Sequence, residues 1–211
     1  MVEKESDRSH VKLEQILTAA QKRFSHYGLA KTAMVDIASD IGMSKASLYY
    51  YFKDKETIFT AVIEKEQILF VQEMKKIIHS SENAGFVLNE YVNLRIAVLE
   101  KMLALGKFSY GSFLEIKPQI GCVLQEFKKE EINMISEILT SGIQRNEFSL
   151  DDVTKHAEFF IDTLLSIRKT IISEHTDSDT LEFSPKKYQK LKDQSKMFAS
   201  IFIKGISSKV V

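Results

Sequence analysis

Cysteine, proline and tryptophan are scarce in this sequence of 211 residues, which has one cysteine, two prolines and no tryptophan. With Cys122 as its single cysteine, the chain cannot form an internal disulfide, and this suits a reducing compartment. The first ten residues are polar and lack the apolar core of a secretory signal. Uninterrupted apolar runs stay well short of the roughly 18 residues that span a bilayer. We therefore expect a cytoplasmic protein that does not bind a membrane.

An excess of charge of one sign is also lacking, because 29 basic and 29 acidic residues give a formal net charge of zero. A neutral chain at first argues against a nucleic-acid partner, since Lys and Arg supply most of the non-specific affinity for phosphates. The charges are unevenly placed, however, with Lys31, Lys45, Lys53 and Lys55 near the N-terminus and many acids in residues 126–137. The neutral total therefore predicts modest non-specific DNA affinity and does not exclude DNA binding.

Signatures of catalysis and of metal binding are missing as well. Cys122 has no catalytic motif around it, and a glycine-rich phosphate loop is not found. His175, Asp177 and Asp179 stand close together but have no other evident metal ligands nearby. We expect no enzymatic activity, no metal and no cofactor.

Apolar residues recur at helical spacing along the chain, and the alternation typical of strands is not seen. The expected helices cover residues 13–27, 33–41, 45–52, 55–80, 86–105, 108–116, 120–145, 150–173 and a last segment from 185. Suitable N-caps precede five of them: Thr32, Ser44, Asp54, Ser149 and Ser184. Residues 175–183 are expected to form a loop. The predicted fold class is all-α.

Residues 33–52 have the spacing of a helix-turn-helix. Ala38 provides a small residue where two helices touch, Gly42 tolerates the backbone of the turn, and Leu48 anchors the second helix in the core. An ordinary pair of antiparallel helices would also satisfy these three positions, so the spacing alone leaves both interpretations open.

The surrounding sequence, from residue 13 to about 64, resembles the TetR family of transcriptional regulators. The matching positions are Phe24 to Gly28, Thr32, Ile37-Ala38, Gly42, Ser44-Lys45, Leu48-Tyr49, Tyr51-Phe52 and Lys55-Glu56. Ala46 stands where the family often has Gly, and Tyr51 where it often has His. The resemblance implies a three-helix, homeodomain-like DNA-binding domain in residues 1–55 and a larger helical ligand-binding and dimerisation domain in residues 56–211.

The second helix of the motif is the predicted recognition helix, which would enter the major groove of double-stranded operator DNA. Base contacts are expected from residues near its N-terminus: Lys45, Ala46, Ser47 and Tyr50. Phosphate contacts are expected from Thr32, Ser44, Tyr49, Tyr51 and Lys55. Three consecutive tyrosines cannot share one helix face, so at least one of them should be partly buried. Lys53 and Lys55 also fit plain surface charges.

A regulator of this kind binds a two-fold operator as a homodimer, and the last two long helices carry the apolar stripes for such an interface. The predicted interface residues are Phe160, Ile161, Leu164, Arg168, Phe198, Ile201 and Phe202. The alternative is that these stripes pack only within one subunit.

The middle of the chain is rich in large flexible and aromatic residues that could line a pocket for a small-molecule effector. The predicted pocket residues are Tyr91, Arg95, Met102, Tyr110, Phe113, Phe127 and Met134. The same residues fit an ordinary core, and they do not identify an effector. The sequence thus predicts a transcriptional regulator, taken as a repressor released by a small molecule, with an activator or a protein-binding helical module as alternatives.

Overall fold

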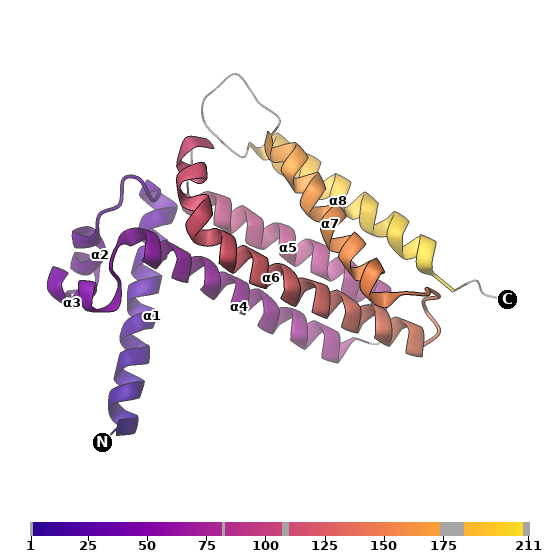
Figure 1. The fold of residues 1–211 in the computed structure, drawn as a ribbon, viewed down its shortest axis with the longest axis horizontal. Coiled ribbons are helices and arrows are strands. Elements are labelled where there is room, and N and C mark those ends of the chain that lie inside the picture. The colour runs from indigo at the N-terminus through magenta and orange to yellow at the C-terminus, as the bar shows by residue number, and fades with distance from the viewer. Residues whose placement is uncertain (1, 82, 107–109, 174–183, 209–211) are drawn as a thin grey trace. The chain divides into compact units, whose positions relative to one another are not determined.

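The computed structural model describes residues 2–81, 83–106, 110–173 and 184–208, and these are mostly helical (Figure 1). Side chains are described for these residues except 2–8, 103–106, 110–117 and 119. The helices are α1 (Val2–Tyr27), α2 (Met34–Asp40), α3 (Lys45–Tyr51), α4 (Lys55–Ser80), α5 (Ala84–Gly106), α6 (Tyr110–Gln144), α7 (Val153–Ser173) and α8 (Pro185–Ile206). An isolated antiparallel bridge joins Phe148 and Ser207, and the described ranges otherwise hold no strand pairing. The predicted all-α class is confirmed.

Contacts between residues divide the chain into two compact units, each described here by itself. The first contains α1, α2, α3 and α4 as far as Glu66, together with residues 101–121. The second contains α4 from Gln67, α5 as far as Glu100, α6 from Cys122, α7 and α8. The division falls within α4, and the predicted domain boundary at residue 55 stays a prediction.

The core of the first unit forms where α1, α2 and α3 meet the start of α4. Phe24 of α1 packs edge-to-face against Phe59 of α4, with ring centroids 5.4 Å apart. Ala38 and Leu48 are fully buried, as the helix-turn-helix spacing predicts. Gly42 has a φ of +59°, a left-handed backbone that most other residues adopt only with strain. The turn therefore depends on glycine at this position.

Aromatic rings connect the helices of the second unit. Phe70 of α4 contacts Tyr91 of α5 and Phe127 of α6, at centroid distances of 5.6 and 5.7 Å. Phe160 of α7 continues the series to Phe202 of α8, at 4.9 Å. Such tilted and edge-on pairs stabilise a core beyond the area they bury. In Figure 1, α7 and α8 run side by side.

Three of the predicted N-caps are confirmed. The side chain of Ser44 accepts a hydrogen bond from the backbone of Ser47, and Ser184 does the same for Lys187. Asp54 accepts one from the Thr57 N–H at 2.7 Å. Each bond satisfies a backbone donor that the first turn of a helix leaves free.

Two predicted caps are wrong. The cap of α2 is Ala33, not Thr32, and the Asp36 carboxylate compensates by accepting from the Ala33 N–H at 3.1 Å. The cap of α7 is Asp152, not Ser149, because Asp152 Oδ1 accepts from the Lys155 N–H at 3.0 Å. At α7 the chain offers two polar residues, Ser149 and Asp152, and Asp152 directly precedes the helix, whereas at α2 the cap position holds an alanine and the Thr32 side chain is bonded to the Gly28 carbonyl.

Two helix boundaries also differ from the prediction. Helix α1 begins at Val2, well before residue 13, and α6 runs unbroken from Tyr110 to Gln144 through Pro118. Pro118 is exposed and lies inside this helix, although a proline removes one helical hydrogen bond and its ring crowds the preceding turn. The predicted loop at 175–183, with His175, Asp177 and Asp179, lies outside the described residues. None of the described helices is both long and apolar enough to cross a bilayer.

Candidate nucleic-acid interface and cavity of the helical body

Helix α3 is held by one buried residue and turns its remaining side chains outward. Leu48 is fully buried, while Lys45, Ala46 and Ser47 are exposed. The Ser47 hydroxyl lies 2.8 Å from that of Ser44, at the N-terminus of the helix. A short helix fixed from one side and free on the other is the arrangement that major-groove reading requires.

The three consecutive tyrosines of α3 differ in exposure, as the helix geometry predicts. Tyr50 is the most exposed, at 86 %, and Tyr51 is partly buried with its ring edge-on to Tyr50. Tyr49 is exposed and lies under the Lys45 ammonium, 5.7 Å from the ring centroid. The exposed face thus combines a cation, hydroxyl groups and flat aromatic surface, which can donate to base edges and phosphates.

Thr32 and Lys55, both predicted phosphate contacts, are engaged inside the first unit. Thr32 is 2 % exposed, and its hydroxyl donates to the Gly28 carbonyl at 2.8 Å. The Lys55 ammonium donates to the carbonyls of Leu29 and Ala30, at 2.9 and 3.1 Å. These bonds fix the segment between α1 and α2. The phosphate assignment of Thr32 does not fit this geometry, because its side chain is buried, whereas the Lys55 ammonium has a third N–H donor left for a phosphate.

The predicted dimer residues are divided between the core of the second unit and its surface. Phe160 is 0 % exposed, Ile161 and Phe202 are also buried, and Leu164 and Arg168 line an internal cavity. Leu164, Arg168 and Phe198 are also partly exposed, and Ile201 is 63 % exposed. The core of the second unit therefore uses part of the predicted stripe, and the assignment of the remaining residues to a dimer interface stays a prediction.

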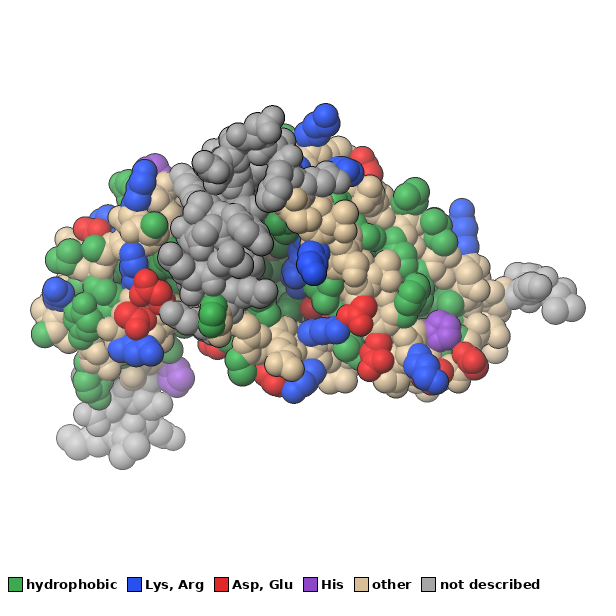
Figure 2. Space-filling model, turned by 45° about the horizontal axis from the view of Figure 1, so that its top comes forward, with side chains coloured by type: hydrophobic (Ala, Val, Ile, Leu, Met, Phe, Trp, Pro, Cys, Tyr) green, Lys and Arg blue, Asp and Glu red, His purple; other side chains and the backbone are tan. Residues whose placement is uncertain are grey.

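Other apolar side chains on α7 and α8 are exposed instead. Phe159 and Met197 join Ile201 as large exposed apolar residues, and Phe159 lies edge-on to Phe198. Figure 2 shows apolar side chains on the surface at the side of these two helices. We call Phe159, Met197, Phe198 and Ile201 the α7–α8 patch. Sequence periodicity missed Phe159 and Met197 because both helices carry apolar residues on more than one face.

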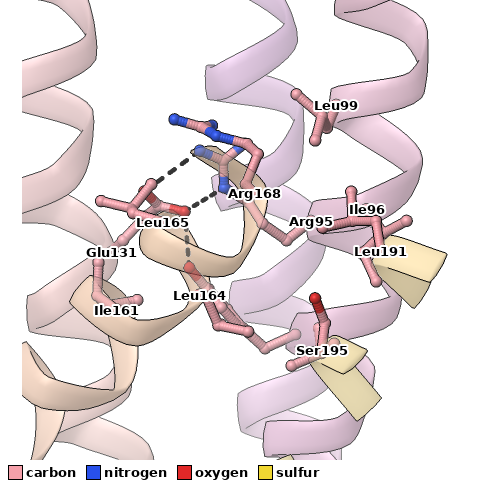
Figure 3. A pocket seen from close by; sticks show the side chains of 12 residues that line it. Arg95, Ile96, Leu99, Glu131, Ile161, Leu164, Leu165, Arg168, Leu191 and Ser195 are labelled. Carbon is pink, nitrogen blue, oxygen red and sulfur yellow. Dashed lines mark hydrogen bonds and ion pairs between the residues drawn. The ribbon is translucent and has the colours of Figure 1, made fainter. Parts of the chain in front are cut away.

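A small cavity of about 30 Å³ lies among α5, α6, α7 and α8 (Figure 3). Seven of its lining residues are aliphatic, three of them from the middle of α7. The polar lining residues are Tyr91, Arg95, Glu131, Arg168 and Ser195. An apolar cavity with a few convergent polar groups is typical of a small-molecule site.

Glu131 organises the polar groups on one side of this cavity. Its Oε1 accepts hydrogen bonds from the Tyr91 hydroxyl, at 2.6 Å, and from Arg95 Nε. Arg95 Nη2 lies 3.5 Å from the other carboxylate oxygen, and the guanidinium carbon stands 4.9 Å from the centroid of the Phe127 ring. Burial raises the pKa of Tyr91 well above its ordinary value, and the Glu131 carboxylate raises it further. Tyr91 therefore stays a neutral hydrogen-bond donor.

Arg168 faces the same cavity and has no hydrogen-bond or ion-pair partner within the part of the chain that the structure describes. Burial lowers the pKa of Arg168 to about 10, and the like charge of Arg95 contributes to that shift. Arg168 still carries its charge at neutral pH. Figure 3 shows both arginines and Glu131 together beside the cavity.

The predicted pocket residues are divided by the structure. Tyr91 and Arg95 line the cavity, whereas Phe127 and Met134 are buried elsewhere in the core and Met102 lies outside the lining. The side chains of Tyr110 and Phe113 lie outside the described residues.

Sequence reasoning missed Glu131 and gave Arg168 a different role. The available signal was an acid in the apolar stripe of residues 127–138, matched by arginines in the apolar stripes of residues 88–99 and 161–171.

Comparisons with known proteins agree with this architecture. Residues 16–62 match a family model described as "Bacterial regulatory proteins, tetR family". The solved structure of a transcriptional regulator from Cytophaga hutchinsonii ATCC 33406 is 42 % identical to this chain, with a TM-score of 0.85, and the match covers 93 % of this chain and 99 % of that one.

Two further similar proteins are a regulator of fatty acid metabolism and a regulator in complex with stearoyl-CoA. The fatty acid metabolism regulator protein of Bacillus subtilis (strain 168) is 25 % identical over 140 residues, which is 64 % of this chain and 70 % of that protein. The structure of the regulator FadR from Bacillus subtilis, in complex with stearoyl-CoA, is 22 % identical with a TM-score of 0.59 over 92 % of this chain and 98 % of that one. The second match shows the fold alone.

Proposed function

This chain belongs to the TetR family of transcriptional regulators and is a DNA-binding regulator rather than an enzyme, and we propose that it acts as a homodimeric repressor released from its operator by a small molecule. The observation that carries the proposal is helix α3, which is anchored by Leu48 and exposes Lys45, Ser47 and Tyr50 on its free side. Such a helix can read a half-site, and two copies can read a palindrome.

The α7–α8 patch supports the dimer. Phe159, Met197 and Ile201 are each more than half exposed, although large apolar side chains are stabilised by removal from water. A two-fold axis through the patch would place α7 and α8 of both subunits in a four-helix bundle, which is a self-complementary arrangement.

The cavity of the second unit supports control by a small molecule. The stearoyl-CoA complex of Bacillus subtilis FadR is consistent with ligand binding in this fold. Helix α4 is continuous from Lys55 to Ser80, so a shift of this helix would move residues of both units. A change in the separation of the two reading helices would then mismatch the half-sites. Coupling of this kind is usually worth about 1 to 3 kcal/mol, which makes release graded.

The DNA-binding proposal is tested by fluorescence anisotropy with the DNA upstream of the protein's own gene. Lys45→Ala and Tyr49→Phe should each weaken binding, because they remove a cation and a hydroxyl from the exposed face. Lys76→Ala is the matched control, since Lys76 is an exposed lysine of α4 in the second unit. Absence of binding even at low salt would overturn the proposal and favour action through a protein partner.

The dimer is tested by sedimentation of Ile201→Lys. This change places a charge in the α7–α8 patch without touching the subunit core, so it should shift the protein towards monomer. Ile68→Lys, at a similarly exposed position of α4, is the control and should leave the oligomeric state unchanged. An Ile201→Lys protein that sediments as wild type would place the interface elsewhere.

A further inference from the structure

The cavity among α5, α6, α7 and α8 contains more positive than negative charge. Two guanidinium groups, of Arg95 and Arg168, share it with one carboxylate, of Glu131. Glu131 is committed to Arg95 and to the Tyr91 hydroxyl. The described side chains around the cavity therefore leave one positive charge uncompensated.

That residual charge belongs to Arg168. Its guanidinium group has five N–H donors, and none makes a hydrogen bond among the described residues. Burial and the nearby Arg95 lower its pKa to about 10, so the guanidinium charge persists at neutral pH but is less stabilised here than in water. Arg168 is partly buried, and a charge that is partly removed from water and has no partner among the described residues is costly, so an anion that pairs with it lowers that cost.

The rest of the lining indicates what the anion carries. Leu164, Leu165 and Leu191 surround the cavity together with four more aliphatic residues, and Ser195 is the remaining polar group. These side chains offer an alkyl chain a hydrophobic environment and offer few partners to a polar ligand. The site is therefore suited to an amphiphile.

We propose that this cavity binds a singly charged amphiphilic anion, a carboxylate on an aliphatic chain, with the carboxylate on Arg168 and the chain among the leucines. The inference rests on the proposed function in taking this cavity as the effector site. A carboxylate matches the planar fork of a guanidinium group and can bind it through two parallel hydrogen bonds. A single negative charge also matches the single excess positive charge, whereas a second one would be repelled by Glu131.

The small volume of the cavity means that binding of the proposed ligand requires a conformational change. A cavity of about 30 Å³ has room for roughly one water molecule, far less than an alkyl chain needs. The chain can enter only if the leucines of α7 and α8 move apart. A ligand that binds an opened form better than this closed form shifts the population towards the opened form, as an effector must.

The experiment is calorimetric titration of the full-length protein with decanoate, decanol and decyl phosphate. These probes share one tail and carry a single negative charge, no charge and up to two negative charges. Decanoate should bind tightest, and Arg168→Gln should weaken its binding roughly 10- to 100-fold, the usual worth of a hydrogen bond to a charged group. Arg168→Lys keeps the positive charge but not the planar guanidinium group. Its affinity for decanoate should therefore lie between those of the wild type and Arg168→Gln.

Lys169→Gln is the matched control, because it removes a charge from the next, exposed residue of α7 and should leave decanoate affinity unchanged. Equal binding of decanol and decanoate, or wild-type affinity in a folded Arg168→Gln protein, would overturn the proposal. If decyl phosphate binds more tightly than decanoate, the claim that the site prefers a singly charged anion is wrong.

DNA binding is measured in parallel, so that the two proposals can fail separately. If decanoate binds through Arg168 but does not weaken the DNA complex, the proposed anion site is supported and its role as the effector site is rejected. If the protein binds its operator and is released by another compound but does not bind decanoate, the proposed function is supported and the proposed anion site is rejected.

Discussion

Replacement of Glu131 by glutamine tests the buried charge network of the second unit. The change keeps the shape of the side chain and removes the only carboxylate among the described residues that line the cavity. Tyr91 would lose a charged acceptor, and Arg95 and Arg168 would face each other without a counter-charge.

The expected cost follows from the burial of the pair. The side chains of Glu131 and Arg95 are 3 % and 13 % exposed, so solvent screens their interaction only weakly. Removing one partner of a buried ion pair costs about 3 to 5 kcal/mol, because the other charge stays buried. Tyr91→Phe removes a single hydrogen bond to a charged group and should cost less, about 1.5 to 3 kcal/mol. A native protein is stable by only about 5 to 15 kcal/mol, so Glu131→Gln should be severe.

Equilibrium unfolding in urea, followed by circular dichroism, measures both variants. Protein concentration is held fixed, because dissociation of a dimer contributes to apparent stability. The double variant Arg95→Met, Glu131→Leu removes the pair together and should be more stable than Glu131→Gln, since no unpaired charge is created at Arg95. A Glu131→Gln cost below about 1 kcal/mol, or a double variant no better than the single one, would refute this account of the network.

Three further predictions concern the first unit. Lys55→Ala should lower the free energy of unfolding by about 1.5 kcal/mol, since it removes the bonds to two carbonyls after α1, and unchanged stability in urea would contradict this role. A shallower dependence of DNA affinity on salt in the same variant would show that Lys55 contacts phosphate as well. Tyr50→Ala should weaken operator binding measured by anisotropy while changing stability by less than about 0.5 kcal/mol, because the ring is 86 % exposed. Asp54→Ala should cost about 1 kcal/mol near pH 7 through loss of the α4 cap. Partial burial acts to raise the pKa of Asp54, but the bonds from Thr57 outweigh it and hold that pKa below its usual 3.8. The cap thus stabilises fully above pH 3.8 and less as pH falls through the folded pKa, so the cost of Asp54→Ala should shrink in acid, while Asp54→Asn, which does not titrate, serves as the control.

The sequence by itself determined the features that depend on neighbours along the chain. The contact of Ala38, the turn at Gly42 and the anchor at Leu48 lie within eleven residues, and helix geometry fixes their relation. The caps at Ser44 and Asp54 are local for the same reason. Local rules were insufficient at Pro118, where the helix continues even though a proline removes one helical hydrogen bond and crowds the preceding turn.

Only the tertiary structure decided which partner each helix face meets. Periodicity identifies apolar stripes on α7 and α8, but it cannot tell that Phe160 packs on Phe202 inside the subunit while Phe159 and Ile201 stay exposed. The charged group at the cavity is a stronger case, since Arg95 and Arg168 are separated by more than seventy residues. In the sequence, each of these arginines is recognised only as a charged residue within an apolar stripe. Their proximity to a single carboxylate, and hence the uncompensated charge, exists only once α5, α6 and α7 pack together, because electrostatic interaction depends on distance in space and on burial.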